Sequence, residues 1–190
     1  MILPPLKWIA SPNFSGRGGA HIDLLVLHDT EGSYAGSIGW FQIPAPRNPN
    51  PVSAHFLVKE DGSEATQMVD IGMKAWHACN VNPRSIGFEM AGVAAKGFGA
   101  AEVQVLADIF AFHLHGMEIP CRHALGGQGP GFCSHYETGM LGGGHSDPST
   151  DPAWMAHFAE LVSASYAKGG FPPIWQAERG MSPCSLRAAL

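Results

Sequence analysis

Apolar runs and alternating patterns along the chain predict a set of short β-strands. Residues 22–28 form an almost continuous apolar run, IDLLVLH, which is typical of a strand buried on both faces. Residues 52–58 and 64–69 alternate between apolar and polar positions on either side of an Asp-Gly turn, and this pattern predicts a β-hairpin. Residues 84–90, RSIGFEM, predict one more short strand. A hairpin combined with two buried runs indicates a mixed sheet.

Three other segments have the character of helices. Residues 100–115 carry apolar side chains at spacings of three or four, so this helix is expected to pack on the sheet. A second helix is predicted for residues 152–167, because Asp151 suits the N-cap and a proline suits the first turn. Residues 37–42 are long enough for one or two turns. The expected fold class is therefore α/β, with a central mixed sheet flanked by helices.

The length and composition indicate one globular domain. A chain of 190 residues can bury one substantial core but is short for two domains. With 45% hydrophobic and 14% charged residues, the composition is that of an ordinary folded protein. We expect a single domain over residues 1–190, with its core at about 20–168 and a C-terminal extension, 169–190, packed on the surface.

Charge and hydropathy argue against several classes of partner. The formal net charge is −5 and the basic residues are not clustered, so we expect no nucleic-acid binding. No apolar run reaches 18 residues, so we expect no membrane insertion. The N-terminus does not resemble a secretory signal, because Pro4 and Pro5 interrupt it and the first basic residue is Lys7. The corresponding expectation is a cytoplasmic location until release to the cell wall. The sequence does not fix the oligomeric state, for which we favour a monomer.

The cysteines leave the redox compartment open. They are too few for a disulfide framework in a chain of this length, and no CxxC pair suggests a zinc knuckle. The four are Cys79, Cys121, Cys133 and Cys184.

Ten histidines raise the question of a metal site. His28 ends the first predicted strand, His135 follows a short run at 131–134, and Asp147 lies in a glycine-rich segment. Two imidazoles, one carboxylate and a water molecule would form an open zinc site of the catalytic kind. The spacing alone leaves alternatives: His28 as an ordinary core histidine, or Cys133 as a ligand in place of Asp147.

Five segments in the same order resemble the type 2 N-acetylmuramoyl-L-alanine amidases. They are VLHDTEG, VSAHFLVKEDG, AWHA at 75–78, SIGFEMAG at 85–92, and a final histidine and aspartate separated by eleven residues, with HSDP around the aspartate. The resemblance covers about residues 20–165. It implies a peptidoglycan-recognition-protein-like fold and zinc-dependent hydrolysis of the amide bond between N-acetylmuramic acid and L-alanine. The family includes phage endolysins, cytoplasmic anhydromuropeptide recycling amidases and non-catalytic peptidoglycan recognition proteins.

The resemblance also implies roles for single residues. It assigns zinc to His28, His135 and Asp147, and catalysis to Glu89 and His145. Many members have lysine or threonine at the position of His145, and phage-type members often have a catalytic tyrosine where this chain has Ala54. The spacing from His135 to Asp147 is long for the family, and we expect the glycines at 142–144 to absorb it as a loop. For Glu89, the alternative is a strand-end charge that faces solvent.

Four further residues are candidates for substrate binding. His55 and His77 are placed to line a groove, although supporting hydrogen bonds or plain surface positions are equally consistent with the sequence. Trp76 offers an aromatic wall of the kind on which sugars pack, and Arg84 offers a partner for a stem-peptide carboxylate. An exposed, unpaired arginine is the alternative for Arg84. Of the family's roles we expect a phage endolysin, with a recycling amidase as the alternative and a binding-only recognition protein as the rival of another class.

Overall fold

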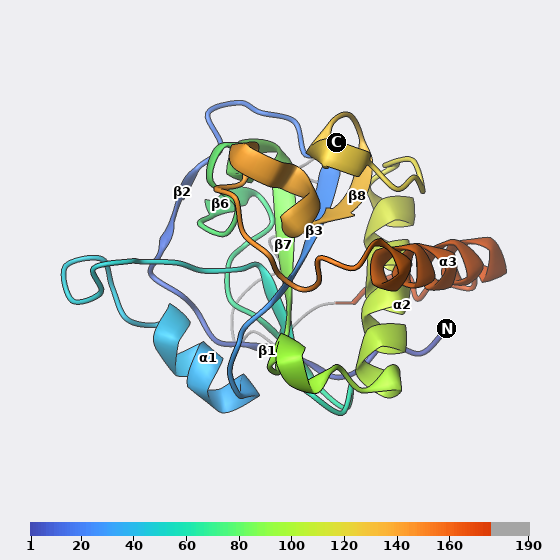
Figure 1. Ribbon diagram of the computed structural model, residues 1–190, viewed down its shortest axis with the longest axis horizontal. Helices are drawn as coiled ribbons and strands as arrows, with labels where there is room; N and C mark the ends of the chain where they lie inside the picture. The colour runs from blue at the N-terminus through green and yellow to red at the C-terminus, as the bar shows by residue number, and fades with distance from the viewer. Residues whose placement is uncertain (176–190) are drawn as a thin grey trace.

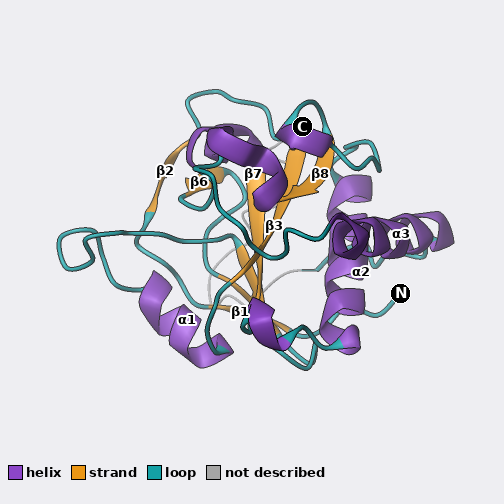
Figure 2. Ribbon diagram, viewed as in Figure 1, coloured by secondary structure: helices purple, strands orange, loops and turns teal. Residues whose placement is uncertain are grey.

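A six-stranded mixed sheet with strand order β1-β5-β4-β7-β3-β8 runs through the centre of the computed structural model, which describes residues 1–175 (Figures 1 and 2). The strands of this sheet are β1 (Leu6–Trp8), β3 (Leu24–Asp29), β4 (Phe56–Val58), β5 (Ala65–Gln67), β7 (Ser85–Met90) and β8 (Gly131–Ser134). A separate antiparallel pair is formed by β2 (Phe14–Gly16) and β6 (Met73–Ala75). The predicted α/β class and mixed sheet are confirmed.

Strand β3 lies between β7 and β8 and runs parallel to both. Every residue of these three strands is buried, as the continuous apolar run at 22–28 predicts for a central parallel strand. Because the three strands point the same way, their C-terminal ends meet at one edge of the sheet. The predicted hairpin is also present, since β4 and β5 pair antiparallel.

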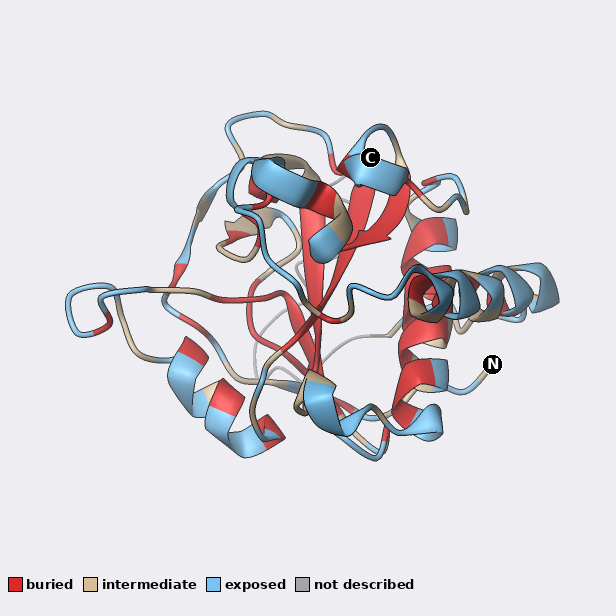
Figure 3. Ribbon diagram, in the orientation of Figure 1, coloured by how far each residue is buried: buried red, intermediate tan, exposed pale blue. Residues whose placement is uncertain are grey.

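Two long helices cover one face of the sheet. Helix α2 (Ala100–Gly116) and helix α3 (Pro152–Lys168) pack together beside the central strands, and in Figure 3 these strands are buried throughout while α3 is largely exposed. Helix α3 begins as predicted, because the Asp151 carboxylate accepts a hydrogen bond from the Ala153 amide at 2.9 Å. Helix α1 (Tyr34–Phe41) begins earlier than expected, since Ser33 caps it.

The two faces of the central strands differ. On the face under α2 and α3, Leu25 and Leu27 of β3 belong to the main hydrophobic core. On the opposite face, Leu24 and Val26 belong to a small apolar cluster. Side chains alternate between faces along a strand, so His28 lies on the face of the small cluster. The strand therefore carries a polar residue on the face that the long helices leave uncovered.

Short elements and the chain ends account for most differences from the expected fold. The sequence did not predict β1, β2 or β6, which are three residues each and too short to show a period. The described part of the predicted C-terminal extension packs on the body, because the Trp175 indole donates to the Pro4 carbonyl at 2.8 Å and stacks with Phe56. Residues 176–190, which include Cys184, lie outside the described residues. Within residues 1–175 no helix is both long and apolar enough to cross a membrane.

Candidate active site

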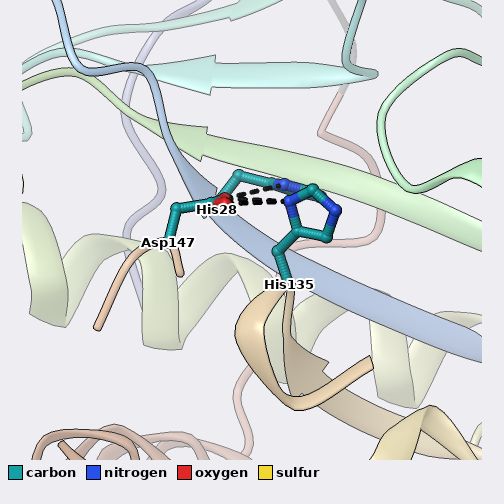
Figure 4. A group of neighbouring side chains, drawn as sticks. All are labelled: His28, His135 and Asp147. Atoms are coloured by element: carbon teal, nitrogen blue, oxygen red, sulfur yellow. Dashed lines mark hydrogen bonds and ion pairs between the residues drawn. The ribbon is translucent and has the colours of Figure 1, made fainter. Parts of the chain in front are cut away.

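Two histidines and one aspartate converge at the C-terminal edge of the parallel strands (Figure 4). His28 lies in β3, and His135 directly follows β8, where its amide donates to the Leu27 carbonyl at 2.9 Å. Asp147 reaches the site on a loop that is held by a 2.8 Å hydrogen bond from the Tyr136 amide to the Asp147 carbonyl. The Nδ1 atoms of His28 and His135 lie 3.2 and 2.9 Å from carboxylate oxygens of Asp147.

The chemistry of these three groups fits a bound cation. The His135 Nε2 atom lies 2.9 Å from the Gly142 carbonyl, which can only accept, so Nε2 carries the proton in the neutral ring. The Nδ1 atom of His135 lies 2.9 Å from a carboxylate oxygen of Asp147, and in the neutral ring its lone pair is available to a cation that this carboxylate also binds. Two imidazoles and one carboxylate are the protein ligands of an open, catalytic zinc site. The residues present therefore fit zinc.

The electrostatic surroundings favour the protonation states that bind a metal. Burial, together with the neighbouring His135, lowers the pKa of His28 to about 4, although Asp147 opposes this shift. Burial alone would raise the pKa of Asp147, but its close contacts with His135 and His28 outweigh burial and hold that pKa well below its usual range. A neutral imidazole and an ionised carboxylate are the ligating forms of these side chains.

Glu89 is a buried neighbour of this cluster. In the parallel register of β7 with β3, Glu89 pairs with His28, so both side chains leave the same face of the sheet. The residue is 7% exposed and its Oε2 atom has no hydrogen-bond partner within the described part of the chain. Burial raises the pKa of Glu89 well above its usual range, and the nearby Asp147 and Asp29 add to this shift. The alternative of a solvent-facing glutamate is wrong.

His145 lies at the open side of the site. Its ring stacks on His135 with centroids 4.4 Å apart, and its Nδ1 atom is 3.8 Å from an oxygen of Asp147. The side chain is 58% exposed, so it can meet a substrate that approaches from solvent. The loop before it contains Gly143 and Gly144 at φ 104° and 75°, values that favour glycine. These glycines form the predicted loop between the ligands His135 and Asp147.

Both candidate groove histidines are hydrogen-bonded within the protein. His77 is partly buried, and its Nδ1 atom lies 3.0 Å from Nε2 of His28. His55 is fully buried: its Nδ1 accepts from the Gly87 amide and its Nε2 lies 3.0 Å from the Met73 carbonyl. The expectation that His55 lines a groove is therefore wrong, because no part of its side chain reaches the surface.

Trp76 and Arg84 are both anchored by polar groups of the protein. The indole of Trp76, which is half-buried, donates to the Ser15 hydroxyl at 3.1 Å. Arg84 lies at the start of β7, where its guanidinium binds Asp23 at 2.7 Å and also donates to the carbonyls of Gly127 and Gly129. Arg84 is therefore not an unpaired surface arginine. The expectation that it binds a substrate carboxylate is also wrong, because Asp23 and two main-chain carbonyls already occupy its guanidinium.

Cys133 is excluded from the ligand cluster by its packing. It is fully buried in the small apolar cluster with Leu24 and Val26, and burial raises the pKa of its thiol to about 12. A thiol with so high a pKa is a poor source of the thiolate that binds zinc. Among the described residues, the ligand cluster instead contains Asp147.

One supporting residue, Arg17, had no signal in the sequence. Its guanidinium donates to the carbonyls of Ile71, Asn82, Pro83 and Ser85, and burial lowers its pKa to about 10. It thereby ties the loops below the site to the start of β7. Its Nη2 atom also lies 2.9 Å from Nε2 of His55. An arginine whose partners are all far away in sequence forms no local motif.

A family model and a curated relative both identify the chain as similar to N-acetylmuramoyl-L-alanine amidases. The family model described as N-acetylmuramoyl-L-alanine amidase matches residues 18–154. The chain is 34% identical over 162 residues to N-acetylmuramoyl-L-alanine amidase A of Achromobacter lyticus, an alignment that covers 78% of this chain and 88% of the relative.

Two solved structures have the same fold. The Staphylococcus aureus hydrolase AmiA, solved in complex with its ligand, superposes with a TM-score of 0.67 at 18% identity and covers 87% of this chain and 85% of its own. A selenomethionine derivative of AmpD gives a TM-score of 0.63 at 23% identity and covers 85% and 99%. At these identities the likeness concerns the fold alone.

Proposed function

The chain belongs to the N-acetylmuramoyl-L-alanine amidase family and is an amidase of peptidoglycan, and we propose that it works with one zinc ion held by His28, His135 and Asp147. The observation that carries this proposal is the convergence of two histidine Nδ1 atoms on one carboxylate at 2.9 to 3.2 Å. When bound there, zinc would polarise the substrate carbonyl and lower the pKa of a water molecule toward about 7.

Glu89 is the proposed proton carrier. Its carboxyl is buried beside the ligands and has an oxygen without a partner, so it has a free position for a proton. It accepts a proton from the attacking water and passes it to the departing amine of L-alanine. Burial favours the protonated form of Glu89, which is the form that delivers a proton to the departing amine.

His145 is the proposed donor to the substrate oxygen. Its exposed ring stacks on His135 next to Asp147, at the side from which substrate enters. A hydrogen bond from this ring to the carbonyl oxygen would strengthen as negative charge develops there in the transition state.

For the biological context we propose a phage endolysin, which resides in the host cytoplasm and then degrades the cell wall after release. The exposed position of His145 supports this proposal, because an open site admits a polymeric substrate. A recycling amidase that cleaves soluble anhydromuropeptides is the alternative, and both roles share the same bond cleavage. A binding-only recognition protein is disfavoured because all three proposed ligands and Glu89 are present.

The experiment that tests the proposal compares substrates. Purified zinc-loaded protein is incubated with intact sacculi and with soluble anhydromuropeptide, and mass spectrometry identifies the new ends. An endolysin releases stem peptides with a free L-alanine amine from sacculi, whereas a recycling amidase acts mainly on the soluble fragment. Binding to sacculi without new ends would refute the catalytic proposal.

A further inference from the structure

We propose that His77 is a positioning residue that fixes His28 in the tautomer with a bare Nδ1, the atom offered to zinc; this inference rests on the metal site proposed above. His77 touches His28 on the side opposite Asp147, with 3.0 Å between His77 Nδ1 and His28 Nε2. The two rings are perpendicular, with centroids 5.0 Å apart.

Ser85 stands at the far end of a chain of hydrogen bonds that leads to His28. The Ser85 hydroxyl donates its proton to the Val81 carbonyl at 2.9 Å. Its oxygen also lies 3.2 Å from Nε2 of His77 and, with its proton engaged, can only accept there. Nε2 of His77 must therefore carry the proton.

The proton on Nε2 of His77 determines the tautomer of His28. A neutral imidazole donates from one nitrogen and accepts at the other, so His77 Nδ1 is an acceptor. The proton of the 3.0 Å contact then belongs to His28 Nε2, and His28 Nδ1 is left with its lone pair. That lone pair faces the Asp147 carboxylate at 3.2 Å. The chain of bonds from Ser85 thus prepares His28 as an Nδ1 ligand.

The second histidine ligand, His135, is held in the same tautomer, but by a main-chain group instead of a side chain. The Gly142 carbonyl accepts from His135 Nε2 and leaves its Nδ1 bare. The Gly142 carbonyl therefore fixes the tautomer of His135, whereas the side chains of Ser85 and His77 fix that of His28. Hydrogen bonds of this kind orient ligating histidines and fix their tautomer.

Strand β7 is built to leave room for the His77 ring. A Cβ atom at Gly87 would lie 2.6 Å from Cγ and 2.7 Å from Nδ1 of His77, so a side chain there would push the ring away. The main chain at His77 is also fixed, because the Asn82 side chain accepts from the amides of His77 and Ala78. These contacts occupy both ring nitrogens and account for the position of His77 without a bound sugar or peptide.

The test compares His77→Ala, which removes the acceptor, with His77→Asn, whose Oδ1 lies near the former Nδ1 position and retains an acceptor. His157→Ala, on the exposed surface of α3, is the control for loss of a histidine. The first readout is the nitrogen NMR spectrum of histidine-labelled, metal-free protein, which reports the tautomer of His28. The second is the zinc dissociation constant from competition with a chelator, and thermal unfolding of the metal-free samples checks the fold.

In the parent we expect His28 to be protonated at Nε2. His77→Ala should produce a mixture of His28 tautomers and weaken zinc binding by about 10- to 100-fold. His77→Asn should recover most of the affinity, and the control should match the parent. A purely structural role would lower the unfolding temperature of both His77 variants without a change in the His28 tautomer.

Two results would overturn the inference: an Nδ1-protonated His28 in the metal-free parent, or His77→Ala with parental tautomer and parental zinc affinity. If the parent binds no zinc, the proposed metal site fails, while the NMR spectrum of the same sample still decides whether His77 fixes the tautomer of His28. If His77→Ala does not fold, the inference is tested by the His28 tautomer in the parent and by the tautomer and zinc affinity of His77→Asn.

Discussion

Glu89 and His28 are direct partners in the parallel pairing of β7 with β3. Neighbouring strands lie about 4.8 Å apart, so main-chain hydrogen bonds set the separation between the proposed base and the proposed metal ligand. Both residues belong to strands that are buried along their whole length. The proposed base and one proposed ligand are therefore held by buried strands, whereas His135 directly follows β8 and a loop supplies Asp147 and His145.

Glu89→Gln should retain zinc and lose about 100- to 10,000-fold in kcat, because the amide cannot take the proton of the attacking water. The shape of the side chain is nearly unchanged, so the buried position should tolerate it. Rates on muropeptide and zinc content are measured on one sample. A variant with zinc and more than roughly a tenth of the parental rate would show that another group carries the proton.

Parent protein should contain about one zinc per chain, as three protein ligands and a water molecule require. Asp147→Ala should abolish metal retention and activity, since the two remaining imidazoles leave the site incomplete. Cys133→Ser should leave zinc content unchanged, because the thiol is packed in the apolar cluster. Elemental analysis after dialysis gives the metal content. A loss of zinc in the cysteine variant alone would mean that the ligand assignment is incorrect.

Arg84→Met should destabilise the fold by about 1 to 3 kcal/mol and leave kcat/KM unchanged, because the variant loses bonds to Asp23 and two carbonyls. Arg122→Met is a matched control, since that guanidinium donates only to the Pro130 carbonyl among the described contacts. Denaturant unfolding and steady-state kinetics are compared. A raised KM with unchanged stability would instead show that Arg84 binds the substrate.

Glu102→Gln should stabilise the protein by an amount that grows as pH rises from about 4.5 to 8. Burial raises the pKa of Glu102 from 4.5 to about 8, and its Oε1 atom is buried without a partner in the described part of the chain. A folded-state pKa above the unfolded value gives stability that is complete below pH 4.5 and is lost as pH rises through 8. Glutamine does not titrate and avoids this loss.

The measurement for Glu102 is the unfolding temperature of parent and variant between pH 5 and 8. Glu160→Gln, at an exposed position of α3, serves as the control and should show no such trend. A difference between parent and Glu102→Gln that stays constant with pH would contradict the raised pKa.

The strongest sequence patterns predicted their elements well. The apolar run at 22–28 became β3, and the stripe at 100–115 became α2, because burial of one face or one stripe leaves a regular pattern in the sequence. Strands of three residues such as β2 and β6 are too short to show a period, so the sequence pattern does not predict them. The resemblance to a known family selected the three clustered ligands from ten histidines and sixteen acidic residues, which spacing alone did not do.

Side-chain contacts that depend on the tertiary fold could not be predicted from the sequence. His77 and Ser85 are eight residues apart, and only the loop between β6 and β7 brings the hydroxyl to the ring. Nothing near Arg84 in sequence predicts the Asp23 carboxylate as its partner, so the sequence alone leaves Arg84 available to a substrate. Such errors arise because a side chain's partner depends on the tertiary fold rather than on its neighbours in the chain.

The central position of β3 has a consequence for synthesis on the ribosome. Its two neighbours are β7, at Ser85–Met90, and β8, at Gly131–Ser134, so one edge of β3 stays unpaired until more than a hundred further residues have been made. An apolar strand with a free edge is a template for association with other chains. A product truncated before β8 would therefore be inert and, in addition, prone to aggregate.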